Sequence, residues 1–342
     1  MMKSWLNHTS KDDLKEYTSD LSQVAGLRPF VYADGRLRGM RGIDGWTGSG
    51  LRFTLWPDRA LDIGPVWFGD KPVAWLHPAA ASPQYFEPAG LGWLRTYGGG
   101  LLTTCGLVHI GAPDEYQGQA FGLHGRIAHT PAENLRLWQE WQGENYLLAV
   151  EGEVRQTVLF GEVLTLYRRI ETNLGSRELR IVDRVVNEGH RPQPHSLLYH
   201  CNFGFPIVSP NSRLVIDDVK VEPRTPAAEA GLLDHTRFQE PEPGYEEQVF
   251  FHTPKKEKDG TATAALFNPE LKFGVRLNWS VGTLPILTQW KMMGAGEYVC
   301  GLEPATHAMA PWETLAERNL PRVLRPGEAI WHELNLNIIF EL

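Results

Sequence analysis

Three segments in the middle of the chain decide its fold class: YLLAVEGEVRQTVL (residues 146–159), VLTLYRRIE (163–171) and ELRIVDRVVN (178–187). Apolar and polar residues alternate along much of each segment, which is typical of strands that bury one face. Gly161 separates the first two segments, and the turn-forming residues 173–176 separate the last two. The pattern predicts an antiparallel meander.

The same pattern continues on both sides of these segments. Between residues 30 and 63, short apolar runs are broken by glycines and by two Asp-Gly pairs, which favour turns. Further strand-like runs cover residues 261–267, 271–281, 284–291, 297–303 and 329–340. Residues 222–248, rich in Pro, Glu and Ala, interrupt the pattern and are expected to form a long loop. Many short strands and few helical patterns predict an all-β protein, a large antiparallel β-sandwich.

The N-terminal part has a helical pattern instead. Ser10 can cap a helix, acidic residues follow it, and apolar side chains recur at helical spacing in Leu14, Tyr17, Leu21 and Val24. We therefore expect a short helix over residues 10–25. Because all-β domains often exceed the average domain length, we divide the chain into an N-terminal helical extension (1–29) and one sandwich domain (30–342).

Composition narrows the class of function. The formal net charge is -8 and no basic block occurs, which argues against a nucleic-acid-binding surface. No stretch has the length of a signal-peptide core or of a membrane span, so we expect a cytoplasmic protein without membrane contact. Cys105, Cys201 and Cys300 lack paired spacing and are expected to be reduced and buried. No cofactor is indicated.

Two segments carry candidate acid/base chemistry. The first is HSLLYHCNFG (195–204), and the second is YVCGLEPATH (298–307), in which Glu303 ends an apolar run before a proline. An imidazole and a carboxylate, with ordinary pKa values of about 6.5 and 4.3, can exchange protons with a substrate at neutral pH. Taken singly, His200 is more typical of a core histidine and Glu303 of a salt-bridged carboxylate.

Short motifs in these segments resemble the aldose 1-epimerase (galactose mutarotase-like) superfamily. HCNF (200–203) and LEP (302–304) match its histidine followed closely by an aromatic residue and its Leu-Glu-Pro context. The resemblance implies a large antiparallel β-sandwich and a sugar as the substrate. It also implies that Glu303 is the general base for the anomeric hydroxyl and His200 the general acid for the ring oxygen, so that the hemiacetal ring opens.

A third motif, FGLHGR (121–126), is similar to the Leu-His-Gly element of the superfamily, whose histidine contacts the sugar. The resemblance makes His124 a candidate for substrate binding. Many members continue with a second glycine, where this sequence has Arg126. A guanidinium offers a fork of donors for vicinal hydroxyls or for an anionic group on the sugar, and a structural pair with an acidic neighbour is an equal alternative.

Two more segments, WPDRALDIG (56–64) and TYGGGLLTTCGL (96–107), resemble a bacterial branch of the superfamily, DUF4432-like, whose function is poorly defined. The resemblance makes Arg59 and Asp62 candidates for positioning the substrate. An internal ion pair is the alternative for Asp62. Among the tryptophans we choose Trp290 as a wall on which the sugar ring stacks.

His195 has an open role. It lies five residues before His200, so on a regular strand the two side chains face opposite sides of the sheet. Substrate binding and a core position are both compatible with this spacing. A metal ion is not expected, because no metal-binding spacing occurs, although one alternative has five residues converge on an ion: His77, His124, His195, His200 and Glu303.

The expected partner is a small-molecule sugar or sugar derivative, and the sequence leaves a homodimer open. Two other functions compete with mutarotation. One is a carbon epimerase or isomerase, with or without a metal ion, and the other is a non-catalytic carbohydrate-binding protein, because a fold alone does not separate binding from catalysis. The acid/base pair favours an enzyme.

Overall fold

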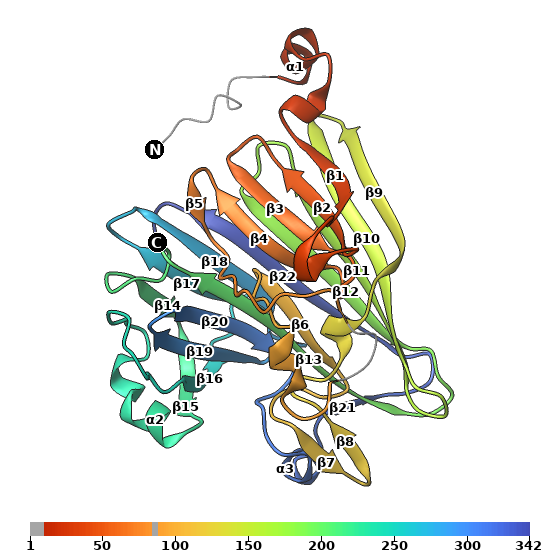
Figure 1. Ribbon diagram of the computed structural model, residues 1–342, viewed down its shortest axis with the longest axis vertical. Helices are drawn as coiled ribbons and strands as arrows, with labels where there is room; N and C mark the ends of the chain where they lie inside the picture. Colours follow the sequence, from red (N-terminus) through yellow and green to blue (C-terminus); the bar gives the residue numbers. More distant parts are fainter. Residues whose placement is uncertain (1–9, 84–87) are drawn as a thin grey trace.

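Two large antiparallel sheets form the body of the protein (Figure 1). The computed structural model describes residues 10–83 and 88–342. Within this part, both sheets contribute to one main hydrophobic core between them. The predicted fold class, an antiparallel β-sandwich, is therefore confirmed.

The first sheet carries the candidate acid/base residues and has the order β1-β2-β3-β4-β6-β13-β20-β19-β16-β15, with β5 beside β4 and β21 beside β13. Its strands are β1 (Gly26–Val31), β2 (Arg41–Trp46), β3 (Leu51–Trp56), β4 (Asp62–Phe68), β5 (Lys71–Pro72), β6 (Leu102–Leu107), β13 (Gln193–Gly204), β15 (Asp218–Pro223), β16 (Gln248–Pro254), β19 (Ile286–Gly294), β20 (Glu297–Ala305) and β21 (Arg322–Leu324).

The second sheet contains the meander from which the fold was predicted. Its order is β14-β17-β18-β22-β12-β11-β10-β9. Its strands are β9 (Glu133–Gln142), β10 (Asn145–Thr157), β11 (Val163–Asn173), β12 (Glu178–Asn187), β14 (Arg213–Ile216), β17 (Thr261–Asn268), β18 (Phe273–Ser280) and β22 (Ala329–Ile339). A separate hairpin pairs β7 (Asp114–Tyr116) with β8 (Gln119–Phe121).

Helices are short and peripheral. They are α1 (Lys11–Tyr17), α2 (Pro226–Ala230), α3 (Trp312–Glu317) and the 3₁₀ turns η2 (Leu21–Gln23), η3 (Gly35–Leu37), η4 (Gly92–Arg95), η5 (Ile127–His129) and η6 (Leu232–Asp234). None in the described residues is long and apolar enough to cross a membrane. Residues 222–248, predicted as a long loop, contain α2 and η6 between β15 and β16.

The N-terminal helix is shorter than the sequence predicted. Ser10 caps α1 by accepting from the amide of Asp13, as expected, but the helix ends at Tyr17. The hydroxyl of Thr18 binds the carbonyl of Leu14, and Asp20 starts η2, because such side chains compete for backbone groups. Strand β1 then begins before residue 30 and pairs with β2.

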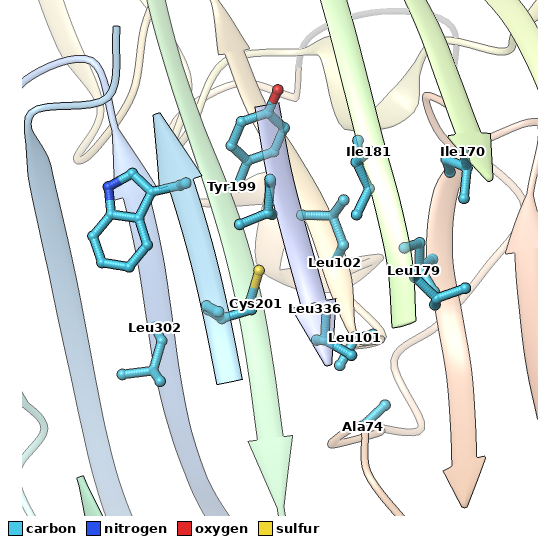
Figure 2. Packing of buried hydrophobic residues seen from close by; sticks show 14 of the residues in the cluster. Ala74, Leu101, Leu102, Ile170, Leu179, Ile181, Tyr199, Cys201, Leu302 and Leu336 are labelled. Atoms are coloured by element: carbon cyan, nitrogen blue, oxygen red, sulfur yellow. The ribbon is translucent and has the colours of Figure 1, made fainter. Parts of the chain in front are cut away.

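Strand β13 shows how alternation separates the core from the site. Its odd-numbered residues Tyr199 and Cys201 point into the main core, where they join Leu302 of β20 and the second-sheet residues Ile181 and Leu336 (Figure 2). Even-numbered residues of β13 therefore lie on the outer face of the first sheet. The cysteines Cys105, Cys201 and Cys300 are free and buried, as predicted.

Candidate active site

His200 and Glu303 come together on the outer face of the first sheet. Strands β13 and β20 are hydrogen-bonded neighbours, with Cys201 opposite Leu302. Because these two residues point into the core, the adjacent His200 and Glu303 both point outward. Nε2 of His200 lies 3.2 Å from Oε1 of Glu303, so the two groups that the motifs singled out are in contact.

The pair lies in a cavity of about 570 Å³. This volume is in the range of small-molecule sites. Both side chains are almost fully buried at its base, with 6% of His200 and 1% of Glu303 exposed. The described residues that line the cavity come from both halves of the chain and are Trp75, His77, Leu91, Trp93, Leu94, Tyr97, Gly111, Ala112, Pro113, Leu123, His124, His200, Arg224, Glu247, Val249, Thr288, Trp290, Met292, Glu297, Glu303 and Met309.

Asn202 fixes the protonation of the His200 ring. Its amide nitrogen donates to the backbone carbonyls of Gly100 and His200, at 3.0 and 2.9 Å, so its oxygen Oδ1 must be the acceptor on the other side. Nδ1 of His200 lies 2.6 Å from this oxygen, and the hydroxyl of Tyr97 donates to it at 2.7 Å. Nδ1 therefore carries a proton, and Nε2 is the nitrogen that exchanges a proton beside Glu303.

Burial changes the acid/base properties that the sequence suggested. It raises the pKa of Glu303 well above its ordinary value, and the negative charge of Glu247 raises it further. It lowers the pKa of His200 to about 4, since the hydrogen bond that the ring donates to Asn202 opposes the effect only in part. Burial thus favours the neutral form of each group, with the exchangeable proton on Glu303. We had expected a carboxylate beside a protonated imidazole.

The carboxyl group of Glu303 fits beside a glycine. A Cβ atom on Gly301 would lie 2.5 Å from Oε1 of Glu303, too close for any real contact, and 3.1 Å from Cβ of Trp290. Thr288 is the partner of Glu303 across the strand pair. Oε1 of Glu303 and Oγ1 of Thr288 are buried and make no well-aligned hydrogen bond with a described residue. They are available to a ligand.

His124 reaches the cavity from a strained loop. It has a positive φ of 59°, and Gly125 follows with φ of 70°. A Cβ on Gly125 would meet the carbonyl oxygens of Gly106 and His109 at 2.7 and 2.8 Å, which explains the glycine of this motif. The amide of Gly111 donates to Nδ1 of His124 at 3.3 Å, so Nε2 carries the proton and is a donor for a ligand.

Aromatic rings surround the pair. The Trp290 ring lies edge-on to His200 with centroids 5.4 Å apart, and edge-on to Trp75 with centroids 6.0 Å apart. Trp93 stacks on Tyr97 at 4.2 Å. Nε1 of Trp290 donates to Oε2 of Glu247 at 2.8 Å, which holds the indole in place. These rings give the cavity the apolar surfaces on which a sugar ring can stack.

His195 lies on the other face of β13. Its Nε2 is 3.0 Å from Nε2 of His332, a residue of β22 in the second sheet. Both rings are buried between the sheets. The five-residue spacing predicts that His195 and His200 lie on opposite faces of the strand, and in the structure they do. His195 does not line the cavity, and this proximity to His332 replaces the substrate contact that we had considered.

Three other expected binding residues have protein partners instead. Arg126 forms an ion pair with Glu162. Arg59 donates to the carbonyl of Ala81 at 3.1 Å, and burial lowers its pKa to about 10. The described residues that line the cavity do not include Arg59, Asp62 or Arg126. The structure thus gives Arg126, Arg59 and Asp62 partners within the protein in place of the expected substrate contacts.

Asp62 belongs to a buried network between the sheets. One of its oxygens accepts from Arg168 at 2.6 Å and from the hydroxyl of Thr104 at 2.6 Å. Arg168 also holds both oxygens of Asp183, at 3.0 and 2.7 Å. Arg168 and Asp183 come from the second sheet and Asp62 from the first. The ion pair considered for Asp62 thus exists, with Arg168 as the partner.

Sequence reasoning missed several cavity residues. Tyr97 lies in the quoted Gly-rich segment, and the hydrogen bond to Asn202 depends on a contact between distant segments. Arg224 and Glu247 lie in the stretch that we treated as a loop, so nothing in the sequence placed them near Glu303. Trp75 and Trp93 line the cavity as well, and so does Trp290, the tryptophan chosen from the sequence.

The five residues considered for a metal ion are not gathered around one point. His195 faces away from the cavity, as described above. In the described part of the chain, metal-ligating atoms converge instead at Asp218, His235 and His252, where they all lie within 4.8 Å of one another. This group shares no residue with the set considered from the sequence.

Solved structures with this fold include sugar epimerases. A candidate aldose 1-epimerase from Klebsiella pneumoniae has a TM-score of 0.87 at 24% identity, over 96% of this chain and 86% of that chain. A galactose mutarotase-like protein from Clostridium acetobutylicum has a TM-score of 0.62 at 14% identity, over 92% and 99%. Galactose 1-epimerase from Lactobacillus acidophilus has a TM-score of 0.59 at 11% identity, over 92% of this chain and 98% of that chain. At these identities the likeness establishes the fold.

Sequence comparison gives the family. No curated protein matches the chain. The model of the family described as a domain of unknown function, DUF4432, matches residues 37–338. This range includes the cavity residues of both halves of the chain, from Trp75 to Met309. The chain therefore belongs to the DUF4432 family and has a galactose mutarotase-like fold.

Proposed function

We propose that the protein is an aldose 1-epimerase-like enzyme that interconverts the anomers of a reducing sugar, with Glu303 and His200 as its acid/base pair. The observation that carries the proposal is the 3.2 Å contact between Nε2 of His200 and Oε1 of Glu303 at the base of an aromatic cavity. Ring opening needs one group that takes the proton of the anomeric hydroxyl and one that gives a proton to the ring oxygen.

The pair can perform both steps without exchanging a proton with solvent. Before ring opening it holds an ionised Glu303 and a protonated His200; afterwards it holds a neutral carboxylic acid and a neutral imidazole. Both states contain the same number of exchangeable protons, so the reaction converts one into the other. Burial favours the neutral state, from which ring closure starts, and a hydroxyl donated to Glu303 favours the ionised state.

The charges of the cavity favour a neutral sugar. Its carboxyl groups are Glu247, Glu297 and Glu303, and Arg224 is the guanidinium among its described lining residues. Arg126, which could have bound an anionic substituent, is paired with Glu162. An anionic sugar would meet more negative than positive groups, which costs binding energy in a buried site.

The test is NMR in heavy water on a panel of reducing sugars, including neutral, acidic and phosphorylated members. We expect wild-type protein to accelerate anomer exchange of a neutral sugar without deuterium entering carbon. Glu303→Gln should abolish the acceleration, while Glu229→Gln, on the exposed surface of α2, should keep it. Deuterium at carbon would make the protein a carbon epimerase or isomerase, and no turnover with retained sugar binding would make it a binding protein.

A further inference from the structure

A group of metal-ligating residues lies on the side of the first sheet away from the active-site cavity. Asp218 begins β15, His252 lies in β16, and His235 follows η6. On β16, Val249 lines the cavity, and His252, three residues later, faces the opposite side. We call Asp218, His235 and His252 the Asp218 cluster. Its ligand atoms all lie within 4.8 Å of one another.

One nitrogen of the His235 ring keeps its lone pair. Its Nδ1 lies 2.6 Å from the backbone carbonyl oxygen of Leu232. A carbonyl can only accept, so Nδ1 carries the proton and Nε2 carries a lone pair. Histidines that bind metals usually donate their second N–H to a carbonyl or carboxylate in this way.

The His252 ring has the same arrangement. Nε2 of Gln289 donates to the carbonyl of His235 at 2.6 Å, so Oε1 of Gln289 is an acceptor. This oxygen lies 3.1 Å from Nε2 of His252, which therefore carries a proton. Nδ1 of His252 is left with a lone pair, and it lies 2.8 Å from Oδ2 of Asp218. A lone pair and a carboxylate oxygen this close repel each other unless a cation joins them.

A proton or a metal ion can be that cation, and the rest of the cluster favours the metal ion. A proton can join only two atoms, Nδ1 of His252 and Oδ2 of Asp218. A metal ion can also bind a third residue, and the ligand atom of His235 lies within 4.8 Å of those of the other two residues. Oδ1 of Asp218 is buried and has no hydrogen-bond partner among the described residues. His252 is fully buried, but the Asp218 side chain is 13% exposed, so an ion can enter from solvent.

We propose that the Asp218 cluster binds a Zn²⁺ ion through Asp218, Nε2 of His235 and Nδ1 of His252. Two imidazoles and one carboxylate with an open fourth position are a common zinc ligand set. The carbonyl of Leu232 and the side chain of Gln289 hold the two rings in the tautomers that zinc requires.

The position of the site suggests what the ion does. His235 belongs to the segment between β15 and β16 that also contains the cavity residues Arg224 and Glu247. Zinc would tie this segment to the two strands and so stabilise one wall of the cavity. The role is independent of the reaction that takes place in the cavity.

The experiment is a calorimetric titration with zinc chloride of untagged, chelator-treated protein. We expect one zinc ion per chain, with a binding constant at least about tenfold weaker in His235→Gln and in Asp218→Asn. His190→Gln, which changes an exposed histidine, should bind as wild type does. Zinc should also raise the melting temperature of wild type and His190→Gln, and raise that of the two cluster variants less at the same zinc concentration.

Three outcomes would overturn the proposal: no stoichiometric binding, binding unaffected by both cluster substitutions, or binding lost in His124→Gln, which would place the ion in the cavity. Circular dichroism of the metal-free variants is the check that they are folded. Asp218→Asn keeps the size of its side chain, so it tests the site even if His235→Gln is unstable.

Discussion

Oδ1 of Asn202 lies 2.6 Å from Nδ1 of His200, and its amide nitrogen is held by two backbone carbonyls. The amide therefore cannot turn, and it sets the orientation and tautomer of the imidazole. An aspartate at this position would add a negative charge beside the ring.

We expect Asn202→Asp to raise the pKa of His200, which burial lowers to about 4 in wild type. The acidic limb of the kcat/KM profile should move to higher pH, because the pair then takes up its second proton more readily. Asn202→Ala should lower kcat by up to about 10²-fold and leave KM nearly unchanged. An unshifted profile in Asn202→Asp would contradict this role.

Glu303 and His200 should behave as one unit. Each single substitution, Glu303→Gln or His200→Gln, should lower kcat by about 10²–10⁴-fold. The double variant should be no slower than the worse single variant, because removing one partner already disables the proton exchange. Saturation-transfer NMR of anomer exchange measures this, and multiplicative losses would show that the two residues act separately.

Gly301 should be needed as a glycine. In Gly301→Ala the new methyl group would meet Oε1 of Glu303 at 2.5 Å and displace the carboxyl group. We expect a loss of kcat of about tenfold or more with little change in melting temperature, since a misplacement of about 1 Å can cost this much. Gly282→Ala is the control, because its Cβ would come no closer than 4.0 Å to the nearest side-chain atom. Full activity in Gly301→Ala would show that Glu303 has room to move.

Arg168 should be needed for stability. Arg168→Met leaves Asp62 and Asp183 buried without their cation, which should lower the free energy of unfolding by about 3–5 kcal/mol. Arg155→Met removes three ion pairs of a side chain that is 40% exposed, and should cost about 1 kcal/mol or less. Urea denaturation measures the free energy of unfolding of both variants. Similar losses would contradict the expectation that burial makes the Arg168 ion pairs the more important ones.

Buried histidines should make the protein sensitive to acid. Burial lowers the pKa of His129 and of His332 to about 3, whereas in the unfolded chain it is about 6.5. Below pH 6.5 the unfolded chain takes up protons that the native protein does not, so stability falls as pH drops from 6.5 toward 3. His332→Gln should reduce the slope of the free energy of unfolding against pH by up to about 1.4 kcal/mol per pH unit.

Urea denaturation between pH 7 and pH 4 measures that slope. The control is His190→Gln, which replaces an exposed histidine. A slope equal to that of wild type in His332→Gln would show that this ring is protonated in the native protein.

Local sequence determined the fold class. Alternation in residues 146–187 is a property of neighbouring residues, and it survives in β10, β11 and β12, where buried and less buried side chains alternate along much of each strand. The same rule placed His195 and His200 on opposite faces of one strand. The motifs containing His200 and Glu303 also pointed to the cavity, since their residues lie on adjacent strands of one sheet.

Only the tertiary structure decided which partner each polar side chain has. Arg126 pairs with Glu162 and Asp62 with Arg168, and nothing in the local sequence distinguishes these pairs from substrate contacts. Long-range strand pairing also brings Asn202 beside Tyr97 and buries Glu303, which favours the neutral forms of the acid/base pair over the charged forms that the sequence predicts. Burial and hydrogen bonding arise between segments far apart in the chain, so a sequence pattern can propose the groups but not their ionisation.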